Sequence, residues 1–271
     1  MARHDPPVTA NPWDALRRFT SARIALGRAG VSLPTQPQLA FQLAHAQARD
    51  AVHQALDVPD LVARLQPLGI GGDQVLHVHS AAADRLTYLQ RPDLGRRLCD
   101  ESRAQMMMGG EPSQRRFDIA FVIADGLSSL AVSQNAVPFL AELMGRIGPE
   151  NWSVAPLVVA SQARVAIADE IGELLGARLV VILIGERPGL SSPDSMGLYL
   201  TWMPARGLTD ASRNCISNVR PQGLVYAEAA YKLHYLMAQA HLRGLSGVAL
   251  KDETTGEGAD TLEVGANFLL G

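Results

Sequence analysis

Short, almost entirely apolar runs alternate with helical patterns in the middle of the chain. Residues 118–124 (DIAFVIA), 155–160 and 178–185 are the apolar runs, and residues 133–147 and 167–175 are the helical segments between them. Apolar runs of this length are typical of strands buried on both faces. A β-α-β-α-β order implies parallel strands joined by right-handed crossovers. The sequence therefore predicts an α/β fold with a doubly wound parallel sheet.

The segment before the first apolar run has a mainly helical pattern. Asn11 and Pro12 form a typical helix start, and we expect this helix to run to about Gly27. A second helix is predicted over residues 37–56, with Leu39 and Leu43 on its apolar face. Helical patterns also cover residues 81–89 and 92–105.

Beyond residue 185 the pattern predicts a strand over 198–203, a helix over 226–243 that ends at Gly244, and a last strand over 247–250. The predicted organisation has three parts. A mainly helical domain covers residues 1–112, an α/β domain covers 113–252, and an acidic tail that we expect to be mobile covers 253–271.

Composition excludes several classes of function. The net charge is −3 and aromatic residues make up 5% of the 271 residues, which argues against nucleic-acid binding. No uncharged apolar run approaches the roughly 18–20 residues of a membrane span, and the first residues lack the apolar region of a secretory signal. Two cysteines, Cys99 and Cys215, are too few for a disulfide framework. We expect a reduced, cytoplasmic protein.

Polar residues follow the three apolar strands, where ligands bind in doubly wound sheets. They lie in residues 125–128, 161–165 and 185–189, and include Asp125, Ser128, Glu186 and Arg187 in the first and last of these segments. These side chains predict a ligand crevice at the strand ends. The alternative is that Asp125 and Ser128 are turn residues, and that Glu186 and Arg187 pair in a solvated loop.

Common catalytic and nucleotide-binding motifs are absent from the sequence. There is no G-x-G-x-x-G between a strand and a helix, no G-x-x-x-x-G-K-[ST], and no G-x-S-x-G nucleophile elbow. His77 and His79 lack the cysteine or carboxylate neighbours of a metal site. The sequence therefore predicts no metal site in this chain and gives little support for a nucleotide-binding enzyme.

Several long strings carry a closer resemblance. The chain contains GERPGLSSPDS (185–195), RNCISN (213–218) and YAEAAYKLHYL (226–236). With these strings, residues 13–250 resemble the small subunit of ethanolamine ammonia-lyase, an enzyme that converts ethanolamine to acetaldehyde and ammonia. The resemblance implies a helical N-terminal part and a Rossmann-like C-terminal part. It also implies a hetero-oligomer with a large subunit that holds ethanolamine, and adenosylcobalamin bound between the two subunits.

The resemblance further implies cofactor-binding residues. The cobalamin contacts of the family fall on Val165, Glu186 and Cys215 of this chain. The sequence lacks the D-x-H-x-x-G motif through which many cobalamin proteins supply a histidine to cobalt. We therefore expect the cofactor to keep its own base as lower ligand.

Two other functions remain open, a nucleotide-using α/β enzyme and a non-catalytic assembly subunit. The segment ahead of Trp13 is short beside the long extension of some family members, which serves microcompartment targeting. The expected location is the cytoplasm, with a bacterial microcompartment left open.

Overall fold

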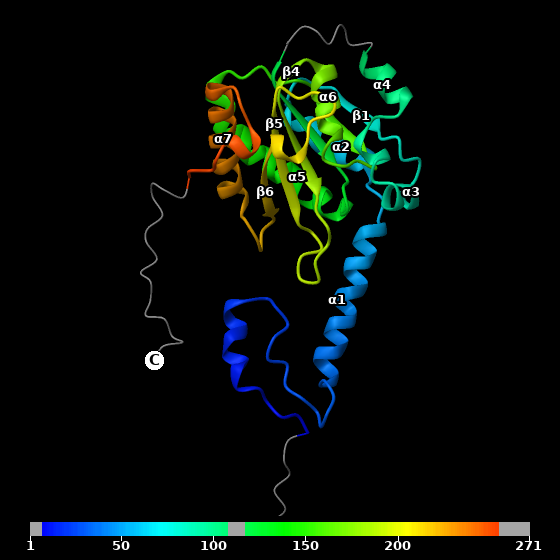
Figure 1. Cartoon of the computed structure of the whole chain (residues 1–271), viewed down its shortest axis with the longest axis vertical. Helices are drawn as coiled ribbons and strands as arrows, with labels where there is room; N and C mark the ends of the chain where they lie inside the picture. The colour runs from blue at the N-terminus through cyan, green and yellow to red at the C-terminus, as the bar shows by residue number, and fades with distance from the viewer. Residues whose placement is uncertain (1–6, 108–116, 255–271) are drawn as a thin grey trace, which may run out of the picture.

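A six-stranded sheet forms the centre of the molecule (Figure 1). The computed structural model describes residues 7–107 and 117–254, and the acidic tail predicted from residue 253 lies almost entirely outside them. The strands are β1 (Val75–His79), β2 (Phe117–Ala124), β3 (Leu157–Ser161), β4 (Ala177–Gly185), β5 (Met196–Trp202) and β6 (Arg213–Val219). Their order across the sheet is β1-β3-β2-β4-β5-β6.

The sheet is mixed, so the prediction of a parallel sheet is wrong for its last two strands. Strands β1, β3, β2 and β4 are parallel, whereas β5 runs antiparallel to β4 and β6 antiparallel to β5. The loop from Gly185 to Met196 contains no helix. A parallel crossover needs a dozen or more residues, usually with a helix, so this short loop returns the chain in the opposite direction.

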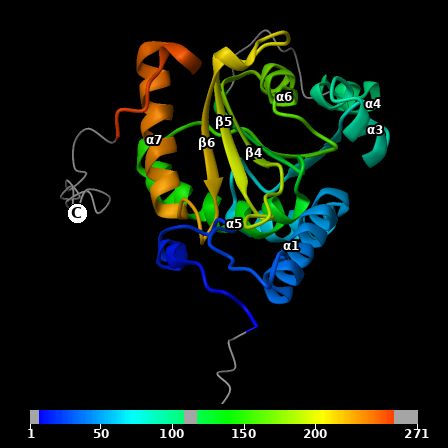
Figure 2. The same ribbon diagram turned by 60° about the horizontal axis from the view of Figure 1, so that its bottom comes forward.

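Helices cover both faces of the sheet (Figure 2). They are α1 (Thr35–His53), α2 (Val58–Leu65), α3 (Arg85–Gln90), α4 (Asp100–Met107), α5 (Ser129–Ile147), α6 (Ile167–Leu175) and α7 (Tyr226–Arg243). Helices α2, α5 and α7 pack on one face, and α6 with Met106 of α4 on the other. Strand β2 is buried on both faces, as its apolar run predicted.

Two strands, β1 and β6, were not predicted from the sequence. Strand β1 carries His77 and His79, and β6 carries polar residues on its exposed positions. Both lie at edges of the sheet, where a strand need not be apolar on both faces. Because β1 joins the sheet from the N-terminal side, the sheet is not confined to residues 113–252. The division at residue 112 stays a prediction.

Two predicted elements have a different form. The strand expected over 247–250 is a 3-10 helix, Gly247–Ala249. The N-terminal helix is a 3-10 helix that ends at Phe19, capped by Asn11, whose side chain accepts a hydrogen bond from the Trp13 backbone N–H at 2.9 Å. None of its residues is buried, so no packing extends it.

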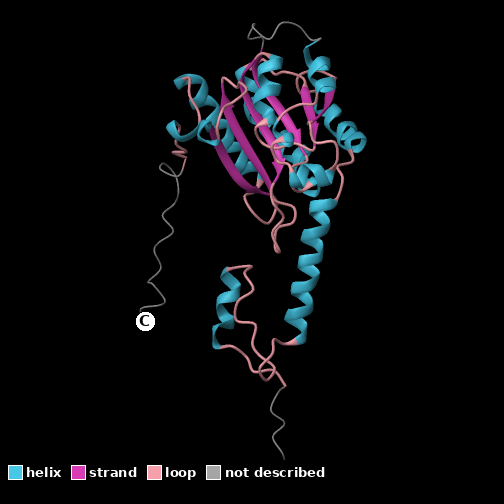
Figure 3. Ribbon diagram, turned by 45° about the vertical axis from the view of Figure 1, so that its right-hand side comes forward, coloured by secondary structure: helices cyan, strands magenta, loops and turns pink. Residues whose placement is uncertain are grey.

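Residues 7–43, here called the N-terminal arm, project away from the sheet and its helices (Figure 3). The arm contains the 3-10 helix Pro12–Phe19 and the first half of α1. Pro34 is its one buried residue. Within the described residues, no helix is both long and apolar enough to cross a membrane.

Candidate functional site

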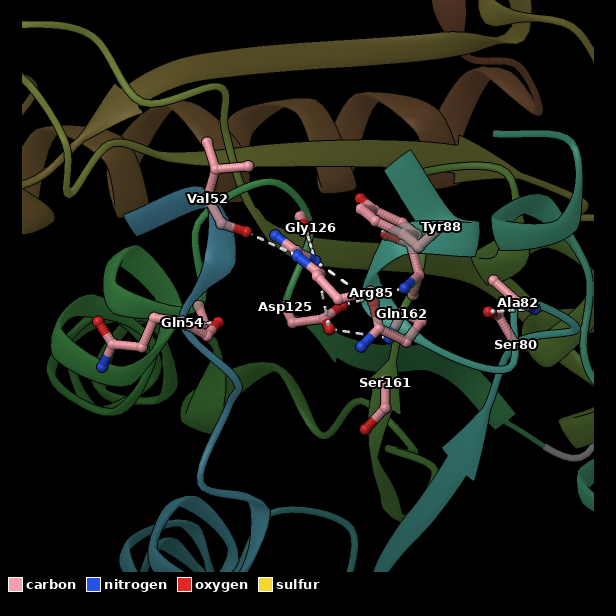
Figure 4. A network of polar contacts seen from close by, with 12 residues as sticks. Val52, Gln54, Ser80, Ala82, Arg85, Tyr88, Asp125, Gly126, Ser161 and Gln162 are labelled. Carbon is pink, nitrogen blue, oxygen red and sulfur yellow. Dashed lines mark hydrogen bonds and ion pairs between the residues drawn. The ribbon is translucent and has the colours of Figure 1, made fainter. Parts of the chain in front are cut away.

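The carboxyl ends of β2 and β3 are joined by a buried carboxylate (Figure 4). Asp125 accepts hydrogen bonds from the backbone N–H groups of Gln162, at 2.8 Å, and Ala163, at 3.0 Å. Burial raises the pKa of Asp125, while these N–H groups and the Arg85 guanidinium, 3.8 Å away, favour its charged form. Asp125 thus joins two of the predicted polar segments, and the Leu127 N–H joins the third by donating to the Gly185 carbonyl at 2.9 Å.

Arg85 of α3, which the sequence analysis missed, closes this edge. It donates to the carbonyl oxygens of Val52, at 2.7 Å, and Gly126, at 2.8 Å. The Tyr88 ring lies near the guanidinium groups of Arg85 and Arg164, 4.7 and 4.2 Å from the ring centroid. Asp125, Arg85 and Tyr88 thus form one network that links α3 to the ends of β2 and β3, which gives it a structural role.

Ser128 is also structural. Its hydroxyl accepts from the backbone N–H of Ala131, which caps α5, and donates to the carbonyl of Pro193 at 2.7 Å. Asp125 and Ser128 flank the turn at Gly126 and Leu127, which agrees with the alternative that they are turn residues. The ligand crevice at these strand ends stays a prediction. The other two predicted polar residues do not pair with each other in the structure, because Glu186 bonds elsewhere and Arg187 is exposed.

Glu186 lies just past β4, on the α6 side of the sheet, with one carboxylate oxygen fixed and the other open. Its Oε2 accepts from the Ser195 hydroxyl at 2.5 Å and from the Asn218 backbone N–H at 3.2 Å. Among the described residues no hydrogen bond reaches Oε1. This oxygen lies above Gly197, where an added Cβ would stand 2.9 Å from it. Gly197 therefore makes the room that the carboxylate occupies.

Cys215 lies on the same side of the sheet, in β6. It pairs in register with Tyr199 of β5, and directly paired residues share a face. Tyr199 packs against the core cluster on the α6 side, whereas Cys215 is exposed. Burial, followed by the neighbouring Cys215 and Glu186, raises the pKa of the Tyr199 hydroxyl. Glu186, Tyr199 and Cys215 thus form one cluster.

Val165 lies in the turn just before α6 and packs against the same core cluster as Tyr199. It lines a pocket of about 560 Å³ that does not include Glu186 or Cys215. Inside this pocket Arg213 and Asp169 form a buried ion pair, and burial raises the pKa of Asp169 against the effect of Arg213. The structure therefore places all three predicted cofactor residues on the α6 side, with Val165 in a neighbouring hollow.

Three further residues of this cluster were not recognised from the sequence. Ser195 and Asn218 fix Glu186, and Tyr199 stands between Glu186 and Cys215. The alternation of Gly197 and Tyr199 in β5 was a usable signal, since both positions face one side of the sheet. No group of three or more His, Cys, Asp or Glu residues in the described part of the chain could hold a metal ion.

Comparison with known proteins gives a consistent family. The family model for the ethanolamine ammonia-lyase light chain (EutC) matches residues 10–251. Proteins described as ethanolamine ammonia-lyase small subunits are similar over nearly their whole length. The relative from Azotobacter vinelandii is 59% identical over 266 residues, 98% of this chain and 97% of its own. The relative from Ralstonia nicotianae is 59% identical over 274 residues, 99% of this chain and 98% of its own.

Proposed function

Because the chain belongs to the ethanolamine ammonia-lyase light chain family, we propose that it binds adenosylcobalamin, base-on, at an interface with the large subunit. The family match over residues 10–251 is the observation that carries this proposal. The cofactor would be held on the α6 side of the sheet. We also propose that the parallel strands β1, β3, β2 and β4, with their helices, are a Rossmann-like unit.

The residues present fit such a cofactor. The corrin ring of cobalamin carries amide side arms, which are hydrogen-bond donors, and the Oε1 atom of Glu186 is an acceptor with no hydrogen bond among the described residues. The exposed Cys215 leaves the sheet face open to a flat ligand. Val165 adds an apolar surface just before α6.

Each residue would have a distinct task. Glu186 would accept a hydrogen bond from an amide, with its carboxylate oriented by Ser195 and the Asn218 N–H. Cys215 would contribute a small packing contact, and Val165 an apolar one. The cofactor supplies the radical chemistry when bound. This chain would position it, and we place the residues that act on ethanolamine in the large subunit.

The same proposal covers assembly and location. The chain would work as part of a hetero-oligomer with the large subunit, in the cytoplasm. A place within a bacterial microcompartment is a narrower form of this proposal, and comparing intact and ruptured microcompartment fractions for the chain would test it.

The test is acetaldehyde release from ethanolamine and adenosylcobalamin by the matching large subunit, with and without this chain. We expect activity only when both proteins are present. Cobalamin retained by the complex, measured by its visible absorbance after gel filtration, gives a second readout. Glu186→Ala and Cys215→Trp should each weaken retention about tenfold or more, since they remove a charged acceptor and block the open face.

Glu228→Ala is the matched control, because Glu228 is an exposed glutamate of α7, which packs on the opposite face of the sheet. It should retain cobalamin as the wild type does. A folded pair of subunits without activity or cobalamin retention would contradict the proposed function. Full activity with unchanged retention in both site variants would instead favour a purely structural role for these residues.

A further inference from the structure

The N-terminal arm carries large apolar side chains that are mostly exposed to solvent. Trp13 and Phe19 are 58% and 68% exposed, and Leu39 and Leu43 of α1 are 58% and 61% exposed. Val31 and Leu33 lie between them in the sequence and are also exposed. Contiguous exposed apolar surface usually marks an interaction site.

Helix α1 also carries exposed apolar residues at helical spacing. Leu39 and Leu43 are four residues apart, so they lie on one face of the helix. Such an apolar face normally packs against a core, but in α1 the buried residues are Ala44 and Ala51, in the half nearer the sheet. Leu39 and Leu43 lie in the half of α1 that extends away from the sheet (Figure 1), and both stay exposed.

The charge of the arm restricts what can cover it. The arm carries Arg17, Arg18, Arg23 and Arg28 against Asp14, a net charge of +3, within a chain whose net charge is −3. Two copies of the arm would repel each other, since like charges at an interface are unfavourable. A partner with an apolar groove and an acidic rim matches both features.

The arm also reaches the loop that follows Glu186. Arg23 donates from Nη1 to the Ser191 hydroxyl at 3.3 Å and from Nη2 to the Leu190 carbonyl at 3.2 Å. The Ser191 hydroxyl in turn donates to the carbonyl of Ser21 at 3.5 Å. A protein bound to the arm would therefore border the loop beside the proposed cofactor site.

We infer that the N-terminal arm is a docking surface for the large subunit, seated in an apolar groove with an acidic rim. This inference rests on the proposed function, because it takes the large subunit as the partner. A specific interface uses about 20–30 residues on each side, and the arm offers a segment of that order. Trp13 and Phe19 are the side chains expected to anchor it, since aromatic residues carry much of the energy at interfaces.

The experiment measures binding of the matching large subunit to the full-length, tagged chain. The double variant Trp13→Ser with Phe19→Ser should bind at least about tenfold more weakly than the wild type. The control is Leu242→Ser with Val248→Ser, because these side chains are at least as exposed but lie on and after α7. The control should bind as the wild type does.

A second pair, Arg18→Glu with Arg28→Glu, tests the acidic rim. It should slow association and reduce its dependence on salt. Circular dichroism of every variant checks that the sheet and helices are unchanged, as expected for exposed positions.

The outcomes separate this inference from the proposed function. Wild-type chain that does not bind the large subunit at all contradicts the proposed function and the inference with it. Binding by the wild type and equally by the Trp13 and Phe19 variant overturns the inference alone. Self-association of the isolated chain that the arm variant abolishes, measured by sedimentation, would overturn it in favour of a second copy.

Discussion

Glu186 illustrates how neighbouring residues prepare a side chain for binding. Ser195 and the Asn218 N–H both contact Oε2, so they fix the carboxylate and leave Oε1 open. Gly197 provides the space, because any side chain there would meet that oxygen. The proposed cofactor contact thus depends on a residue that need not touch the cofactor.

Gly197→Ala is expected to weaken cobalamin retention about tenfold and to lower the free energy of unfolding by about 1–3 kcal/mol, because the displaced carboxylate loses its hydrogen bonds from Ser195 and Asn218. The new Cβ would stand 2.9 Å from Oε1 and displace the carboxylate, which is the flexible end of its side chain. Loss of one hydrogen bond to a charged group costs about 1.5–3 kcal/mol, or about tenfold or more in affinity. Retention by the complex and urea unfolding of the chain would measure the two effects.

Gly145→Ala is the matched control, since Gly145 lies in α5 with nothing within 4 Å of an added Cβ. It should raise the free energy of unfolding by about 0.5–1 kcal/mol and leave retention unchanged. Normal retention in Gly197→Ala would show that the position of Oε1 does not matter.

At the level of elements, hydrogen bonds between side chains and loops fix where strands begin. Asp118 at the start of β2 accepts from the backbone N–H and hydroxyl of Ser153, at 3.0 and 2.7 Å, and so holds the segment that leads into β3. Burial acts to raise the pKa of Asp118. The hydrogen bonds from Ser153 and the charge of Arg178 outweigh it, and the pKa lies below its usual value.

Asp118→Asn should therefore have a pH-dependent cost. A depressed pKa in the folded state stabilises the protein above the unfolded-state pKa, near 4, and this contribution is lost as the pH falls through the folded-state value. The variant should lose about 1 kcal/mol of unfolding free energy at pH 7. The difference from the wild type should shrink below about pH 4.

Urea unfolding of both proteins at a series of pH values measures this difference. Asp73→Asn, at an exposed position, is the control and should track the wild type throughout. A cost for Asp118→Asn that stays constant down to the lowest pH would show that the negative charge contributes nothing.

The whole molecule divides into a packed body and an arm with little burial. The body is held by apolar clusters on both faces of the sheet. The arm buries Pro34 alone and bonds to the body through Arg23 and Ser21. Most of the free energy of folding should therefore reside in the sheet and its helices.

A chain that lacks residues 1–33 should unfold with a free energy within about 1 kcal/mol of the full-length value. The reason is that the removed residues contribute no buried side chain among those described. Urea unfolding, followed by circular dichroism, measures it. A loss of several kcal/mol, or a transition that is no longer cooperative, would show that the arm stabilises the body.

The local sequence pattern predicted the strands that are buried on both faces and the helices with a regular apolar periodicity. Strands β2, β3 and β4 are apolar on both faces, and α6 and α7 lie where their periodicity placed them. The family resemblance could also be recognised from the sequence, and it implied the cofactor-binding residues Val165, Glu186 and Cys215. The sequence did not show that these three residues lie on one side of the sheet.

Tertiary contacts decided the rest, because they join residues far apart in the sequence. Strand β6 is polar on its exposed positions, and its pairing with β5 creates the cluster of Tyr199 and Cys215. The sequence suggested that Asp125 could contact a ligand. In the structure Arg85, from a helix 40 residues earlier in the chain, lies beside it. In the arm, the pattern of α1 predicted an apolar face, and the fold left that face exposed because no other part of the described chain reaches it.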